Sequence, residues 1–182
     1  MNRYQTVERR LGALIVDFVV VVSPLALLDF LILPLQIPTP LLILWLLVSS
    51  SAGAAYHILL QGFYGQTLGK MLLGVKVVTN DRETAISMYQ AFLRETPTIL
   101  FNAAVFVSQA SHAMAGLEVS RTEPKPIETG IMFLAFPWVV AEVICCLKTR
   151  KRRAIHDFIA GTVVVRVDFG IVSEQKQDYT AT

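Results

Sequence analysis

Four long apolar segments constrain this chain more than any other feature of its sequence. They occupy residues 11–35, 41–60, 97–117 and 129–147. A helix needs about 20 consecutive apolar residues to cross the hydrocarbon core of a bilayer. Of the 182 residues, 54% are hydrophobic and only 16% are charged, a balance typical of membrane proteins. We therefore expect an all-α membrane protein with four transmembrane helices.

The distribution of basic residues predicts how the chain is oriented. Fourteen of the 16 Lys and Arg residues lie in the N-terminal arm, in the loop between the second and third segments, or in the C-terminal tail. Because Lys and Arg are retained on the cytoplasmic side, these three regions belong on one side of the membrane. The sequence therefore predicts a multi-pass protein of the cell membrane with both termini in the cytoplasm.

Other classes of protein are excluded by composition and by the lack of motifs. The two cysteines, Cys145 and Cys146, are adjacent, which does not fit a secreted disulfide framework. The net charge of +2 gives no indication of a nucleic-acid partner. The sequence has no phosphate-binding loop, zinc pattern or hydrolase nucleophile motif. We expect neither an enzyme nor a site for a metal or another cofactor.

Residues 68–78 and 155–165 share one pattern at an offset of 87 residues. Apolar residues at the first, fourth, fifth and sixth positions predict a short amphipathic helix in each segment. The glycine at the seventh position is typical of a helix end, and the valines that follow favour a strand. We expect parallel half-repeats of two spanning helices, an interfacial helix and a strand, in which 75–78 and 163–167 pair as a small cytoplasmic β-ribbon. The alignment places Lys70 opposite Asp157.

Titratable residues inside the apolar segments are the candidates for a functional site, because burying charge in a membrane is costly. Asp17 lies roughly 10 Å along its helix from Arg10. Glu142 and His57 enter the bilayer to a similar depth from the same side. In a structural interpretation, Arg10, Asp17 and Asp157 hold the interfacial segments against the first helix. In a functional interpretation, Asp17 binds a cation or a proton with the help of His57 or Glu142. The sequence leaves both interpretations open.

A run of basic residues follows the fourth apolar segment. It is typical of an anchor at a membrane surface that contains anionic lipids. The residues of this predicted anchor are Lys148, Arg150, Lys151, Arg152 and Arg153.

Three ordered blocks of sequence resemble the RDD family of membrane proteins, which is named for one arginine and two aspartates. They are RRLG at 9–12 leading to Asp17, GQTLGK at 65–70 with LGVKVV at 73–78, and RAIHD at 153–157 with AGTVVV at 160–165. The resemblance covers a membrane domain over 7–168 and leaves a polar tail at 169–182. It implies that the naming residues are Arg10, Asp17 and Asp157, and it favours transport, because cation/proton exchange has been proposed for some members.

The sequence supports two functional hypotheses. The first is a small transporter that exchanges a monovalent cation for protons, acting as a homo-oligomer because four helices barely enclose a pathway. In it Asp17 is the central carboxylate, His57 and Glu142 assist, and Arg10 with Asp157 forms a cytoplasmic gate. The alternative is a membrane scaffold or assembly factor whose charged residues are structural. A continuous polar path outward from Asp17 past Asn102 or Ser111 favours the transporter.

Overall fold

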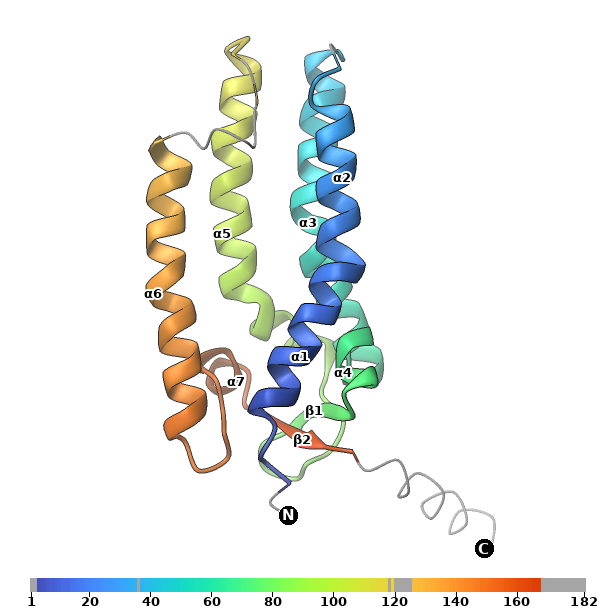
Figure 1. Cartoon of the computed structure of the whole chain (residues 1–182), viewed down its shortest axis with the longest axis vertical. Helices are drawn as coiled ribbons and strands as arrows, with labels where there is room; N and C mark the ends of the chain where they lie inside the picture. The colour runs from blue at the N-terminus through green and yellow to red at the C-terminus, as the bar shows by residue number, and fades with distance from the viewer. Residues whose placement is uncertain (1–2, 36, 118, 120–125, 168–182) are drawn as a thin grey trace, which may run out of the picture.

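The structure, a computed structural model, describes residues 3–35, 37–117, 119 and 126–167. Long helices run side by side, and short helices and a two-stranded sheet gather at one end of the bundle (Figure 1). The long elements are α1 (Val7–Asp17), the π-helix η1 (Phe18–Val22), α2 (Ser23–Ile32), α3 (Thr39–Tyr64), α5 (Met88–Met114) and α6 (Pro126–Lys148). The short elements are α4 (Leu68–Leu72), β1 (Val75–Thr79), α7 (Ile155–Ile159) and β2 (Thr162–Arg166).

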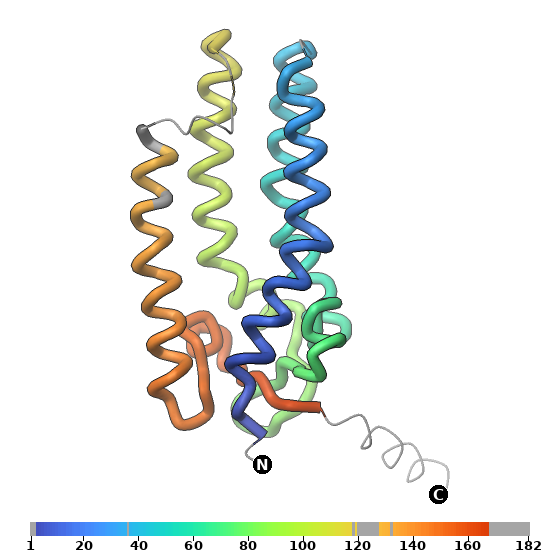
Figure 2. Tube along the Cα trace, in the orientation of Figure 1, coloured from blue at the N-terminus to red at the C-terminus, as the bar shows by residue number. Residues whose placement is uncertain are grey.

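Three helical segments in the described part of the chain are long and apolar enough to cross a membrane. They are Val7–Ile32, Thr39–Tyr64 and Glu128–Lys148. The first contains α1, η1 and α2 in one continuous rod (Figure 2). The helical membrane architecture and the small two-stranded sheet expected from the sequence are confirmed. α5 is not among the three, because polar side chains interrupt its apolar surface along its length.

α5 begins at Met88, nine residues before the apolar run that predicts it. Ser87 explains the difference, because its side chain accepts a hydrogen bond from the Gln90 amide while the Gln90 side chain accepts one from the Ser87 amide. Such a capping box satisfies free donors at a helix start, so the helix extends through a polar segment. As a result, Arg94 and Glu95 lie within α5 and not in a loop.

The repeat expected from the sequence recurs in the secondary structure. The bounds of α4 and α7, and those of β1 and β2, differ by the same 87 residues. Gly74 and Gly161, which are equivalent under this offset, both adopt a left-handed backbone that glycine accommodates without strain. The strands pair antiparallel with Val77 opposite Val164, and these two residues are themselves equivalent. The pseudo-twofold axis that relates the short segments therefore passes through the centre of the ribbon.

The ribbon provides most of the tightly packed core at this end of the bundle. Buried valines from both strands pack with Ile86 and Ala91, and Ile58 of α3 covers them. α3 also packs against α5, whereas α4 packs against α1 and α7 against α5 and α6. The two short helices therefore join the ribbon to different sets of long helices.

Gly69 permits the close approach of α4 to α1. A Cβ atom at this position would lie 2.2 Å from the Ala13 carbonyl oxygen and 2.9 Å from Asp17 Oδ1. Both neighbours are fixed, the first as helix backbone and the second by its hydrogen bonds, so neither can move aside cheaply.

We expect Gly69→Ala to lower the free energy of unfolding by about 1–3 kcal/mol, as overpacking in a core does. Gly130→Ala is the matched control, because a Cβ atom there meets nothing within 4 Å. A gain in helix propensity should make that variant neutral or more stable by up to about 1 kcal/mol. Unfolding midpoints in detergent measure both. Equal midpoints for the two variants would contradict the close packing of α4 on α1.

Candidate functional site

Asp157 is the centre of a buried charge network at the end of the bundle that carries the ribbon. Its side chain is fully buried and forms ion pairs with Arg10 at 2.8 Å and with Arg94. Its Oδ2 also accepts a hydrogen bond from the Ala154 amide at 3.0 Å, and Thr162 Oγ1 donates to Oδ1. Burial acts to raise the pKa of Asp157, but the guanidinium groups of Arg94 and Arg10 outweigh it and hold the pKa well below its usual range. The carboxylate is therefore charged and joins α1, α5 and α7.

Arg94 is the principal member of this network that the sequence analysis does not single out. It is buried, and its guanidinium donates to Gln61 Oε1 at 3.0 Å and to Thr162 Oγ1 at 2.6 Å as well as to Asp157. The available signal is the Ser87–Gln90 capping box, which extends the third long helix back through this arginine.

Asp17 lies apart from Arg10 and Asp157 and holds the start of α4. Its carboxylate accepts three hydrogen bonds: from Thr67 Oγ1 at 2.6 Å, from the Gly69 amide at 2.8 Å and from the Tyr56 hydroxyl at 2.8 Å. Tyr56 in turn accepts a hydrogen bond from the Leu68 amide. Free amides at a helix start attract a carboxylate, so these contacts fix α4 against α1 and α3.

Glu142 does the same for α7. Its two oxygens accept hydrogen bonds from the amides of Ile155 at 3.0 Å and His156 at 3.1 Å, and the His156 ring lies 3.0 Å away. Ile155 and His156 are the repeat equivalents of Leu68 and Gly69, so a carboxylate from a long helix holds the start of the short helix in each half. The two carboxylates come from non-equivalent helices, α1 and α6.

Glu95 differs from these three carboxylates, because within the described residues its carboxylate has hydrogen-bond and ion-pair contacts with side chains alone. Its Oε1 accepts a hydrogen bond from Gln61 Nε2 at 3.2 Å and lies 3.8 Å from His57 Nδ1. Gln61 also lies 3.4 Å from the same His57 nitrogen. Glu95 and His57 thus form a titratable pair between α5 and α3, and the sequence analysis singles out only His57.

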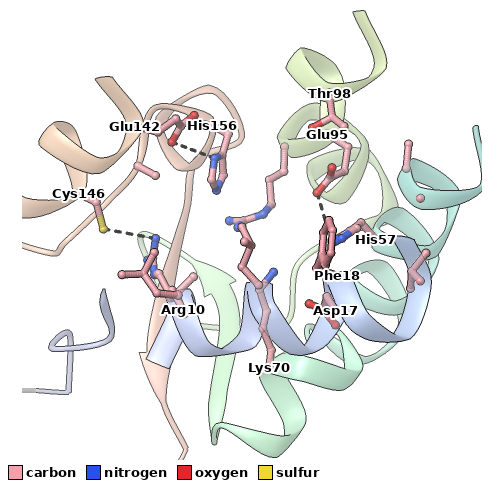
Figure 3. A pocket seen from close by; sticks show the side chains of 18 of the residues that line it. Arg10, Asp17, Phe18, His57, Lys70, Glu95, Thr98, Glu142, Cys146 and His156 are labelled. Atoms are coloured by element: carbon pink, nitrogen blue, oxygen red, sulfur yellow. Dashed lines mark hydrogen bonds and ion pairs between the residues drawn. The ribbon is translucent and has the colours of Figure 1, made fainter. Parts of the chain in front are cut away.

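A cavity of about 590 Å³ lies among these groups. Figure 3 shows the charged side chains around one space, with Glu142 and His156 on one side and Glu95 and His57 on the other. The titratable and cationic residues that line the cavity are Arg10, Asp17, His57, Lys70, Arg94, Glu95, Glu142 and His156. Along η1, which continues α1, the wall is apolar and ends at Val22, whereas along α5 it is polar at Thr98 and Asn102.

The polar path outward from Asp17 is therefore present on one wall of the cavity only. Asn102 is the outermost polar residue of the lining, and its side chain donates to the Ser50 carbonyl at 3.0 Å. Ser111 is not part of the lining. The cavity thus reaches into the bundle from the charged end and stops near Asn102, so the continuous polar path to the outer surface that would favour the transporter is not found among the lining residues.

Lys70 enters the cavity without contacting Asp157, its repeat equivalent. Among the described residues, its ammonium group has no hydrogen-bond or ion-pair partner, and it reaches into the space that Figure 3 shows. Burial, followed by repulsion from Arg94, lowers the pKa of Lys70 to about 8. A negative charge that enters the cavity would attract the Lys70 ammonium and stabilise its charged form.

Three residues of the basic run after the fourth segment contact the protein itself. Lys151 Nζ donates to the Asn80 carbonyl at 2.9 Å, Arg152 to the Leu147 carbonyl at 2.6 Å and Arg153 to the Asp157 carbonyl at 2.9 Å. Lys148 and Arg150 are exposed. Of the residues predicted as a lipid-surface anchor, these two have side chains directed to solvent.

Comparison with known proteins gives one match. The model of the RDD family matches residues 4–161, which is most of the chain. No curated protein and no solved structure matches it.

We expect Asp157→Asn to lower the free energy of unfolding by about 3–5 kcal/mol, because it leaves the Arg94 guanidinium buried without its counter-charge. Asp81→Asn is the matched control, since Asp81 is exposed in a loop and should change stability by less than about 0.5 kcal/mol. Denaturant titration in detergent measures both. If Asp157→Asn and Asp81→Asn have the same free energy of unfolding, the charge network does not hold the elements together.

Proposed function

The chain belongs to the RDD family of membrane proteins, and from this premise we propose that it is a small transporter that exchanges a monovalent cation for protons. The observation that carries the proposal is the Glu95–His57 pair, a partly buried carboxylate and imidazole 3.8 Å apart on the wall of a cavity. Pairs of a carboxylate and an imidazole in a cavity are frequent features of functional sites.

Glu95 is the carboxylate best placed to change its partner. Asp17 and Glu142 accept hydrogen bonds from the main chain of α4 and α7, and Asp157 pairs with two arginines. Releasing any of these three would free a short helix or leave a buried charge unpaired. Glu95 is held by side chains that can rotate, so the proposed exchange carboxylate is Glu95 in place of Asp17, with His57 as its proton partner.

A cation and the protonated His57 compete for the negative charge of Glu95, and this competition couples cation binding to proton release. A protonated His57 balances the negative charge of Glu95, and a cation bound to Glu95 takes over that role. Two positive charges within about 4 Å repel strongly in a poorly hydrated site, so binding of the cation expels the proton from His57. Each cation that binds thus releases one proton into the cavity.

The proposal includes four spanning helices, with α5 as the third, in the cell membrane and with both termini in the cytoplasm. The clustering of basic residues at the ends of the chain and in the middle loop supports this topology. α5 lies beside α3 over much of its length and is 27 residues long, enough to cross the bilayer. Because so few helices enclose the cavity, we also propose a homo-oligomer.

The second candidate function is a membrane scaffold or assembly factor. The observation in its favour is that Arg10, Asp17 and Asp157 all serve the attachment of α4 and α7. In this case the charges fix a cytoplasmic surface made of the ribbon and the short helices, and the protein moves no ion.

We expect cation addition to sealed proteoliposomes with an acidic lumen to dissipate the pH gradient, as a lumenal dye reports. Glu95→Gln should reduce the initial rate at least tenfold. Glu8→Gln is the matched control, because Glu8 is an exposed glutamate of α1 and its variant should retain the wild-type rate. If sodium, potassium and lithium all leave the wild-type gradient intact, exchange is excluded and the scaffold is favoured.

The topology is tested by labelling single cysteines with an impermeant maleimide in intact cells, after Cys145 and Cys146 have been replaced by alanine. We expect Leu35→Cys and Leu117→Cys to react from outside, and Asp81→Cys to react only after the membrane is opened. All three positions are exposed in the structure. Protection of Leu117→Cys from the external reagent would show that α5 does not cross the membrane.

A further inference from the structure

Two cationic side chains of the cavity, Arg10 and Lys70, have N–H groups that no described acceptor binds. Each of the four carboxylates on or beside it accepts hydrogen bonds or pairs with an arginine, as described above for Asp157, Asp17, Glu142 and Glu95. By contrast, the Arg10 Nη2 atom is buried with no partner among the described residues, and the Lys70 ammonium makes no hydrogen bond to them. Buried donors are nearly always satisfied in proteins, so the buried Arg10 Nη2 atom, with the Lys70 ammonium beside it in the same cavity, indicates a place for an anion.

The shape of the cavity indicates where the anion comes from. α1 and α6 border the cavity but are not packed along each other, and Arg10 Nη1 contacts Cys146 Sγ at 3.8 Å at the base of the gap. Leu14 and Phe18 line the cavity and yet are 66% and 54% exposed. These residues therefore lie at an opening between α1 and α6 that faces the surroundings of the bundle.

The chemistry of the opening is that of the acyl region of a bilayer. Leu14, Phe18 and Val143 form its rim within two of the helices that are apolar enough to span a membrane. At the other end, Ala154 and Val164 of the segment around the ribbon close the floor. A ligand that fits has a negatively charged head that reaches Arg10 and Lys70 and an apolar chain that lies in the gap.

We propose that the phosphate headgroup of an anionic phospholipid binds Lys70 and Arg10, with an acyl chain of the lipid lying between α1 and α6. A free phosphate would satisfy the donors but would leave the apolar rim uncovered. A cavity of about 590 Å³ is within the range of roughly 300–1,000 Å³ that accommodates small organic ligands. The lipid phosphate brings a hydrogen-bonding negative charge to the Lys70 ammonium, which Arg94 repels and which Glu95 and Asp17 attract only from a distance.

This site shares the cavity with the proposed exchange pair but uses different side chains. Lys70 and Arg10 belong to α4 and α1, whereas Glu95 and His57 belong to α5 and α3. Lipid binding is measured without an ion gradient, so its failure would not bear on exchange, and failure of exchange would not bear on the lipid.

Native mass spectrometry of the full chain in detergent tests the proposal, with phosphatidylglycerol, phosphatidylcholine and inorganic phosphate as probes. We expect one phosphatidylglycerol molecule to bind at least tenfold more tightly than phosphatidylcholine. Lys70→Gln should abolish that preference, and it should fold normally because the Lys70 ammonium has no hydrogen-bond partner in the part of the chain that the structure describes. Lys148→Gln is the matched control, since Lys148 is exposed near the same membrane surface and should keep the preference.

Three outcomes would overturn the proposal. Equal binding of the two lipids would show that the charge of the headgroup is not recognised. If Lys70→Gln and Lys148→Gln lose the preference for phosphatidylglycerol to the same extent, the preference comes from the general positive charge of the surface. Inorganic phosphate that displaces the lipid at equal concentration would show that the apolar gap contributes nothing.

Fluorescence quenching locates the bound lipid. In Phe18→Trp, the added tryptophan lies at the opening, and in Phe133→Trp it lies on α6 at a position 74% exposed. We expect phosphatidylglycerol with brominated acyl chains to quench the Phe18→Trp increment over wild type at least twofold more than brominated phosphatidylcholine does. The Phe133→Trp increment should be quenched equally by both. Equal quenching at both positions would place the lipid elsewhere.

Discussion

The pairing of buried Asp157 with Arg10 and Arg94 is the interaction on which the rest of the structure depends. It joins the start of α1, the start of α5 and the short helix α7 at one point. A buried carboxylate with two guanidinium groups is stable only when all three are present, because removing one leaves uncompensated charge in a medium of low polarity. The ribbon lies directly beside this cluster through Thr162, so the two halves of the chain meet where the charges meet.

The half-repeat explains how so small a chain builds a cavity. Each half provides long helices and a short helix, and an antiparallel ribbon centred on Val77 and Val164 holds the halves together. Asp17 and Glu142 then fix the two short helices beneath the bundle, which leaves the space above them enclosed by helices from both halves. In this structure Arg10, Asp17 and Asp157 all contact groups that attach the short helices. The groups to which the proposals assign ligand binding are Glu95, His57, Lys70 and Arg10.

Periodicity and composition predicted the local elements well, including both short helices and the ribbon, because each depends on residues close together in sequence. The site was predicted less completely. The uninterrupted apolar run begins only at residue 97, because polar residues such as Gln90 and Thr96 are mixed with apolar ones before it, so hydropathy alone leaves Arg94 and Glu95 in a loop. The partners of Asp17 are 39 to 52 residues away, and no local pattern says which face of a helix meets them.

The central claim is that a cation and a proton compete for the Glu95–His57 pair, and it is tested most directly by proton release from the purified protein. The measurement adds sodium, potassium or lithium to the detergent-solubilised chain in weak buffer near pH 5 and follows a pH indicator. The account predicts release of up to one proton per cation bound, in proportion to the fraction of His57 that starts protonated, and no release in Glu95→Gln. Saturable cation binding with no proton released would contradict it.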